Sequence, residues 1–176
     1  DAIERHRDLV EPHLAKHAPF ENNAFTALNT AFMHDGVFLH VPRGVALDTA
    51  VHALFIATSN AGPVVTHPRN LIIVGAAAQA TFVEDYVSMS DEVALSNAVT
   101  EVMAAADSVV EHYLLERENV RAHNISTLRF QQERGANCAS HSVLLGGHIV
   151  RNNVNPVLTG EGGEGRDDQR RHGRGT

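Results

Sequence analysis

Acidic residues and histidines recur at matched positions along this chain, and three of them could form a metal site. Asp85, His112 and His141 hold the same place in successive copies of a repeat. If the copies stack as strands, neighbouring members of this column lie roughly 4.8 Å apart. Two imidazoles and a carboxylate at that spacing are ligands that a transition metal accepts. The alternative, which we favour, is a solvated polar column on the outer wall of the stack.

Cys138 is the only thiol in the chain, and its chemistry depends on the direction in which it points. In a regular strand it shares a face with Ser140, whereas His141 points to the other face. A metal site that used both Cys138 and His141 would therefore need a bulge. The other members of the column that contains Cys138 are apolar: Phe55, Phe82 and Val109. We predict that Cys138 is a small core residue, and we assign no metal ligand.

Motifs for phosphate binding and for covalent catalysis are absent from the sequence. Lys16 is the only lysine and follows no glycine-rich loop, so there is no Walker A motif. The sequence also contains neither a Gly-x-Ser-x-Gly elbow nor a His-Glu-x-x-His pair. We therefore predict no catalytic residue and no ATP hydrolysis by the chain itself.

The repeat that positions these residues is marked most clearly by four asparagines. These are Asn70, Asn97, Asn124 and Asn153, which follow one another at nearly equal intervals. The mostly apolar column that contains Cys138 precedes them at a constant offset. Two strand patterns per repeat at a fixed internal spacing are typical of coils that stack on one another. We predict an all-β solenoid in which these asparagines form a structural ladder of stacked amides.

Charged residues occur inside several predicted strands, at Glu84, Asp85, Glu101 and Arg129. A solenoid wall has one face toward the core and one toward water, and side chains alternate between them. We therefore expect these charged side chains to lie on the outside.

Composition limits the classes of partner. The net charge is −7 and no basic stripe runs through the repeats, which argues against nucleic acid. The longest apolar runs, such as 71–74, are strand-length and far too short to span a membrane. A single cysteine fits a reducing compartment, and we predict a cytoplasmic protein.

The chain divides into three predicted regions. Residues 1–19 have the pattern of a short amphipathic helix, residues 20–158 form the β-helix core, and residues 159–176 form a polar tail. The tail has no apolar residue and is expected to be disordered. It leaves the last rung of the stack without a cap, so we expect self-association through that C-terminal rung.

Several motifs, taken in order, resemble the SufB/SufD family of iron–sulfur cluster assembly proteins. The resemblance begins with Phe25-Thr26-Ala27-Leu28-Asn29 and Asp35-Gly36-Val37-Phe38-Leu39-His40-Val41-Pro42-Arg43-Gly44. It continues through the motifs His67-Pro68-Arg69-Asn70, Gln132-Glu133-Arg134, Ser140-His141-Ser142, Arg151-Asn152-Asn153 and Gly160-Glu161-Gly162, which look like the SufD branch. The match covers roughly residues 20–163.

The resemblance implies a right-handed parallel β-helix and a scaffold role. It implies a SufB-type subunit and a SufC-type ATPase as partners in a SufB–SufC–SufD complex that supports cluster formation or iron acquisition. After Gly162 the chain departs from the family, as if truncated at its C-terminal end, so we carry over no cluster ligand. We expect no cofactor to bind stably to this chain alone, and an iron–sulfur cluster or iron to bind only transiently in the complex. The alternative is a β-solenoid or cupin-like metal-dependent enzyme that uses a histidine cluster.

Overall fold

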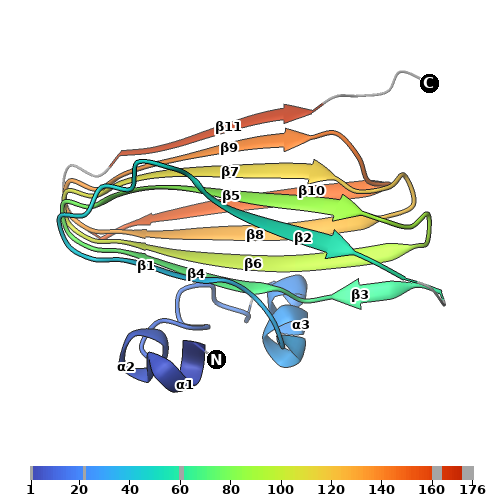
Figure 1. The fold of residues 1–176 in the computed structure, drawn as a ribbon, viewed down its shortest axis with the longest axis horizontal. Helices are drawn as coiled ribbons and strands as arrows, with labels where there is room; N and C mark the ends of the chain where they lie inside the picture. Colours follow the sequence, from blue (N-terminus) through green and yellow to red (C-terminus); the bar gives the residue numbers. More distant parts are fainter. Residues whose placement is uncertain (1, 22, 60–61, 160–163, 172–176) are drawn as a thin grey trace.

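Two parallel sheets face one another, and the chain alternates between them as it winds through successive coils (Figure 1). The computed structural model describes residues 2–21, 23–59, 62–159 and 164–171. Sheet A contains β1 (Phe38–Val41), β4 (Arg69–Val74), β6 (Ala94–Ala104), β8 (His123–Gln132) and β10 (Ile149–Leu158), with β3 (Val64–Thr66) also beside β6. Sheet B contains β2 (Val51–Ala57), β5 (Gln79–Ser88), β7 (Val109–Arg117), β9 (Asn137–Leu144) and β11 (Glu164–Arg171). The predicted parallel β-helix is confirmed.

Side chains that alternate along each strand build the core between the two sheets. In β9 the buried positions are every second residue, from Cys138 to Leu144. The largest apolar cluster is buried on all sides and includes Ile72, Phe82 and Phe130. A single coil would leave the apolar side chains of its inner face exposed on the two sides where neighbouring coils stack. Only stacking against those neighbours removes this apolar surface from water.

Tight corners between the sheets set the length of each coil. Four corners that lead from sheet A to sheet B each contain one residue with a left-handed backbone, with φ between 54° and 72°: Gly44, Ala77, Asp107 and Gly135. The interval from one such position to the next decreases steadily, so the coils become shorter along the chain. At Gly135 the backbone is strained for other residues, and a Cβ atom would also lie 2.3 Å from Asp107 Oδ1.

The predicted asparagine ladder is wrong in register. The offset between paired residues in sheet A decreases from the β4–β6 pair to the β6–β8 pair, and again to the β8–β10 pair. A nearly constant spacing therefore does not connect equivalent positions. The observed partners are Asn70 with Thr100, Asn97 with Ile125, Asn124 with Val150, and Asn153 with Thr127.

The N-terminal segment packs beneath the outer face of sheet A (Figure 1). It contains α1 (Ala2–Arg5), α2 (Arg7–Val10) and α3 (Ala24–Phe32). Asn23 begins α3, since its Oδ1 accepts hydrogen bonds from the N–H groups of Phe25 and Thr26, both at 3.1 Å. This third helix lies within the region predicted as β-helix core. No helix in the described part of the chain combines the length and apolar content needed to cross a bilayer.

Part of the polar tail is a strand, which corrects the prediction of disorder for that part. Residues 164–171 form β11 and pair in parallel with β9. The neighbouring strand supplies backbone hydrogen bonds that composition alone does not reveal. Residues 160–163 and 172–176, which include the Gly160-Glu161-Gly162 motif, lie outside the described residues.

Candidate functional site

A carboxylate lies inside the β-helix, where the sequence predicted only apolar side chains. Glu84 is 2% exposed and points into the core from β5. Its inward neighbours on the strand are Phe82 and Tyr86, which are also fully buried. The prediction that Glu84 lies outside is wrong because the alternation of β5 places the even-numbered residues inward. Asp85 has the outward direction that was predicted, but it is not solvated: Arg117 and His52 bond to its carboxylate, and it is only 2% exposed.

Four polar groups, one each from β4, β5, β6 and β7, converge on Glu84. Tyr86 Oη and Asn70 Nδ2 donate to Oε2 at 2.7 and 3.1 Å. Thr100 Oγ1 donates to Oε1, and His112 Nε2 lies 3.0 Å from the same oxygen. Burial by itself raises the pKa of Glu84, but the hydrogen bond and charge of His112, with the two hydroxyl donors, bring that pKa below its ordinary value. The ionised carboxylate is therefore the favoured form.

His112 extends this polar group toward the next coil. Its Nδ1 lies 3.2 Å from Ser140 Oγ, and the ring of Phe130 meets its ring edge-on at 6.5 Å. Tyr86, at the other end, has a pKa raised well above its usual value by burial and by the Glu84 charge. The arrangement is a closed hydrogen-bonded network, held in an apolar core, that stabilises one buried negative charge.

Two further interior carboxylates, Glu116 and Glu118, lie near the corner that follows β7. Glu118 accepts hydrogen bonds from Ser96 Oγ and Asn124 Nδ2, both at 2.7 Å. Glu116 accepts from the backbone N–H groups of Glu118 and Gly146 at 2.9 and 3.0 Å. Burial raises the pKa of Glu116, and the Glu118 charge adds to the rise. Asn124 therefore binds the Glu118 carboxylate and is not part of a ladder of stacked amides.

The residues of the predicted metal column do not share a column. Asp85 is bonded to Arg117 on the outer wall at 2.7 Å, which lowers the pKa of Asp85. His141 lies on the same wall in another row, 3.3 Å from Glu111. His112 lies inside. Within the described ranges, no group of three or more His, Cys, Asp or Glu side chains is arranged to hold a metal ion.

Cys138 is a buried core residue, as predicted. It packs in the main apolar cluster, and burial raises the pKa of its thiol to about 12, so the reactive thiolate is disfavoured. The column predicted for it is wrong in register, although Phe82 faces the core as predicted and pairs with Val51 and His112. Cys138 pairs with Val110, while Val109 points outward and is 36% exposed.

Another buried carboxylate, Glu101, attaches the N-terminal segment to sheet A. Its side chain accepts hydrogen bonds from the N–H groups of Ala15, His17 and Ala18, at 2.7 to 2.8 Å. Arg69 pairs with the same carboxylate at 2.9 Å. Glu101 is on the outer face, as predicted, but the segment covers it completely, so its exposure is 0%.

Asparagines complete this attachment. Asn29 in α3 donates to the carbonyl oxygens of Pro68 and Asn97, both at 2.9 Å, and accepts from Arg69 at 3.2 Å. Asn97 in turn donates to the Phe25 carbonyl oxygen at 2.9 Å. The sequence prediction missed this role because it treated Asn97 as a rung of a ladder. The buried Arg, Glu and Asn side chains of this attachment occur on one outer face only and do not recur from coil to coil, so the sequence shows no periodic pattern that marks them.

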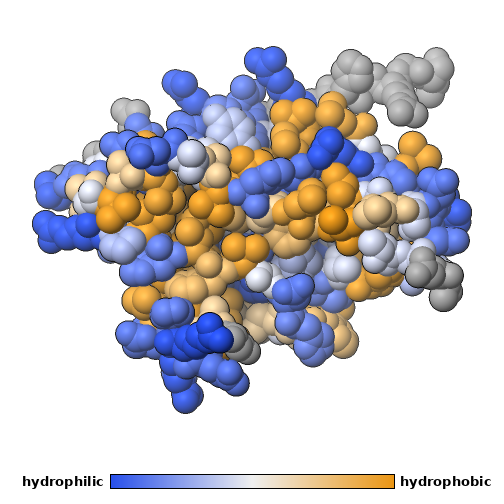
Figure 2. All heavy atoms as spheres, in the orientation of Figure 1, coloured by the Kyte–Doolittle hydropathy of each residue, from blue (hydrophilic) through white to orange (hydrophobic). Residues whose placement is uncertain are grey.

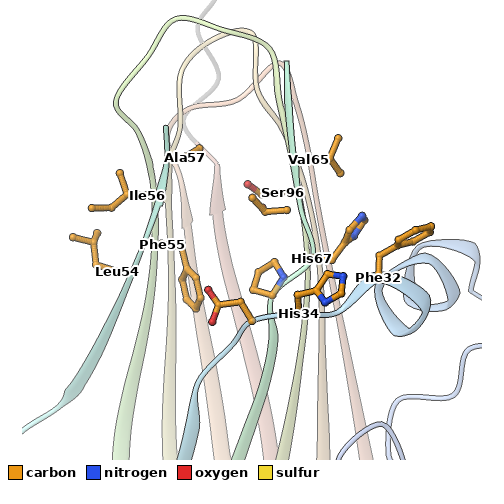
Figure 3. Close-up of a pocket in the computed structure, with 12 residues that line it drawn as sticks. Phe32, His34, Leu54, Phe55, Ile56, Ala57, Val65, His67 and Ser96 are labelled. Atoms are coloured by element: carbon orange, nitrogen blue, oxygen red, sulfur yellow. The ribbon is translucent and has the colours of Figure 1, made fainter. Parts of the chain in front are cut away.

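A cavity of about 580 Å³ opens between the first coil and the connection from α3 to β1 (Figure 3). Phe55 faces the cavity, and its ring stacks on Tyr86 at 4.7 Å. His67 lines the other side, with Phe32 stacked on it at 5.8 Å, and burial lowers the pKa of His67. Figure 3 shows Leu54 pointing away from this space, on the outer face of β2. The lining is mixed, since Asp35, Thr66 and Ser96 lie among the apolar side chains together with the imidazoles.

The outer surface mixes polar and apolar side chains. In the face shown in Figure 2, apolar side chains form separate groups across the middle, while polar side chains gather toward the rims. Leu54 and Ile56 are the exposed apolar residues of β2, each about half exposed.

Comparisons with known proteins match both parts of the chain. Residues 55–172 match the family model "SUF system FeS cluster assembly, SufBD core domain", and residues 1–53 match "SufBD protein N-terminal region". A relative described as an iron–sulfur cluster assembly SufBD family protein, from Staphylococcus haemolyticus, is 30% identical over 166 residues. Relatives with the same description from Staphylococcus epidermidis and Staphylococcus aureus are 30% and 29% identical. The alignments cover 93% of this chain and 35% of each relative, so the chain spans about a third of their length.

Proposed function

Because the chain belongs to the SufBD family, we propose that it is part of a non-enzymatic scaffold subunit for iron–sulfur cluster assembly. The observation that carries the proposal is the match to both the N-terminal region and the core domain of the family. The polar groups support a structural role. Glu84, Glu101 and Glu118 are each buried and bonded to neighbouring residues of the same chain.

We propose further that the subunit is of the SufD type and acts in the cytoplasm with a SufB-type subunit and a SufC-type ATPase. The SufD assignment rests on the motifs that begin at His67 and Ser140. ATP hydrolysis belongs to the ATPase partner in this proposal, since the sequence has no Walker A motif.

Co-expression tests the complex. The tagged protein is expressed with untagged SufB-type and SufC-type proteins from the same organism, and the affinity eluate is analysed by size-exclusion chromatography and mass photometry. We expect both partners to elute with it in fixed stoichiometry. An unrelated tagged β-solenoid serves as the control bait. Recovery of neither partner, with all three proteins soluble, would contradict the proposal.

Anaerobic reconstitution tests where the cluster is held. Iron–sulfur clusters are usually held by four cysteine thiolates, and the single thiol of this chain is buried with a raised pKa. We expect the chain alone to retain no stable cluster after iron and sulfide are removed by desalting, and Cys138→Ala to behave identically. Persistent charge-transfer absorption that is lost in Cys138→Ala would assign the cluster to this chain.

A further inference from the structure

The loop between α2 and α3 is fixed from below by a buried carboxylate. Ala15 has a left-handed backbone, with φ of 59°. The N–H groups of Ala15, His17 and Ala18 all point at the two oxygens of Glu101. Successive N–H groups turned to one side form a concave anion site of the kind called a nest. Arg69 also pairs with Glu101 at 2.9 Å, so the carboxylate that binds the loop is itself held in place.

This loop brings two imidazoles together at its surface. His13 Nδ1 and His17 Nε2 are 3.1 Å apart, and the rings stack with centroids 5.4 Å apart at 29°. Two nitrogens bound to one tetrahedral Zn²⁺ at about 2.0–2.1 Å would be separated by about 3.3 Å. The two nitrogens therefore already lie close to the separation that a shared metal ion requires.

The charge state also suits a metal. Burial lowers the pKa of His17, and the neighbouring His13 and Arg129 lower it further, while Glu101 acts in the opposite direction. A neutral imidazole has a lone pair available for a cation, so the lowered pKa of His17 favours the form that can bind one.

We propose that His13 Nδ1 and His17 Nε2 chelate one divalent first-row transition-metal ion, with water completing the coordination. Imidazole nitrogen suits ions such as Zn²⁺ and Co²⁺, whereas Mg²⁺ and Ca²⁺ prefer oxygen ligands. When the ion binds, the hydrogen on the donating nitrogen moves through solvent to the other nitrogen of the same ring, and no net proton is released. Among the described residues, no third His, Cys, Asp or Glu side chain joins this pair to complete a ligand set. Binding is therefore reversible and weaker than at a structural site with four protein ligands.

Calorimetric titration of the purified protein with Zn²⁺ alone, at neutral pH, measures this site. We expect one ion per chain for the parent, and loss of that site in both His13→Ala and His17→Ala. The matched control is His6→Ala, since His6 is an exposed histidine of the same segment and should leave the site intact. Titration with Mg²⁺ should give no binding.

A second measurement does not depend on variants. Long-range ¹H–¹⁵N spectra of the parent protein separate the ring nitrogens of the histidines, and Zn²⁺ should shift the signals of His13 Nδ1 and His17 Nε2 first. No uptake by the parent would overturn the proposal, because the pair would then be only a hydrogen bond. Equal stoichiometry in the parent and both variants, or first shifts at other histidines, would overturn it by placing the metal elsewhere.

Discussion

The Glu84 carboxylate and the His112 imidazole form a bonded pair that is almost completely removed from water. Breaking such a pair by removing one partner leaves an uncompensated buried group, whereas replacing both partners with apolar residues can be nearly neutral. We expect Glu84→Ala or His112→Ala to lower the free energy of unfolding by about 3–5 kcal/mol. Urea denaturation measures the change.

Glu111 provides the control for this prediction, because it lies on the outer wall and pairs with the partly exposed His141. Glu111→Ala should stay within about 0.5 kcal/mol of the parent. The double variant Glu84→Leu/His112→Leu should lose less than either single alanine variant. Equal losses for Glu84→Ala and Glu111→Ala would mean that the interior pair does not carry the stability assigned to it.

Stability should also depend on pH through the same network. The pKa of Glu84 is lowered in the folded state, and so is that of Asp85, which is bonded to Arg117. A lowered folded pKa contributes stability that is present above the unfolded pKa and lost as the pH falls through the folded pKa. The pKa of Tyr86 is raised, so its contribution is complete below about 10, the ordinary value for tyrosine, and is lost as the pH rises through the folded pKa.

Urea midpoints measured across pH should therefore form a plateau with an acid and an alkaline limb. Glu84→Gln should make the acid limb shallower, since one of the two linked carboxyls is removed. Tyr86→Phe should lower the plateau and flatten the alkaline limb. If the slope of the acid limb is unchanged in Glu84→Gln, the protonation of Glu84 does not contribute to the loss of stability at low pH.

At the scale of strands, the register decides which residues are in the core. Phe82 is fully buried, and Phe82→Ala should cost about 3–5 kcal/mol. Val110→Ala should cost clearly more than Val109→Ala, because only Val110 points inward. Chemical denaturation compares the three variants. A larger loss for Val109→Ala would restore the register predicted from the repeat. His172→Ala, in the tail, is predicted from the sequence to stay within about 0.5 kcal/mol of the parent, and this position lies outside the described residues.

The sequence was sufficient to predict coils and insufficient to predict their register. Alternation within strands and two strands per repeat are local patterns, and both are present in the structure. The register failed because residue identity was matched at a constant spacing, while the corners at Gly44, Ala77, Asp107 and Gly135 are progressively closer together. Gly, Ala and Asp share no side-chain signal for a left-handed backbone. The same shift placed His112 outside and grouped it with Asp85 and His141.

The polar clusters could not be predicted for a related reason. Glu84 and Glu101 have the same residue type, yet one faces the core and the other faces the N-terminal segment. Their burial depends on partners far away in sequence, such as Ala15 for Glu101. Cys138 was predicted correctly because a small apolar residue in an alternating strand needs no distant partner.

The attachment of the N-terminal segment should be testable as a unit. Glu101→Ala removes the acceptor of three backbone N–H groups and the partner of Arg69. We expect limited proteolysis to cleave within residues 11–20 much faster in this variant, with the β-helix intact. The control is Glu133→Ala, since Glu133 binds the Ala106 N–H at an exposed corner. Equal cleavage rates for the parent and Glu101→Ala would show that other contacts hold the segment.

For the whole molecule, β10 and β11 are the last strands of their sheets among the described residues, and each has a strand neighbour on one side only. An edge with unpaired backbone groups can pair with another chain. Leu158, at the end of β10, is 55% exposed. We therefore expect light scattering of the isolated chain to reveal a dimer or a larger species.

Leu158→Lys should reduce this association, because a charge at an edge opposes strand pairing. Val120→Lys is the control, since Val120 is 61% exposed and lies in the corner between β7 and β8, outside the edge strands. A monomeric parent, or the same reduction by both variants, would contradict association through the C-terminal edge.

The shortening of the coils, from the pairing of Phe38 with Leu71 to that of His123 with Ile149, has a consequence for inheritance. A codon gained or lost at a corner changes the length of a coil and leaves the strands on both sides in phase. A codon gained or lost within a strand such as β7 reverses the inward and outward faces of the residues that follow in that strand. Lineages that carry this β-helix should therefore differ in length at corners such as 118–122 and 145–148, while the strands keep their length.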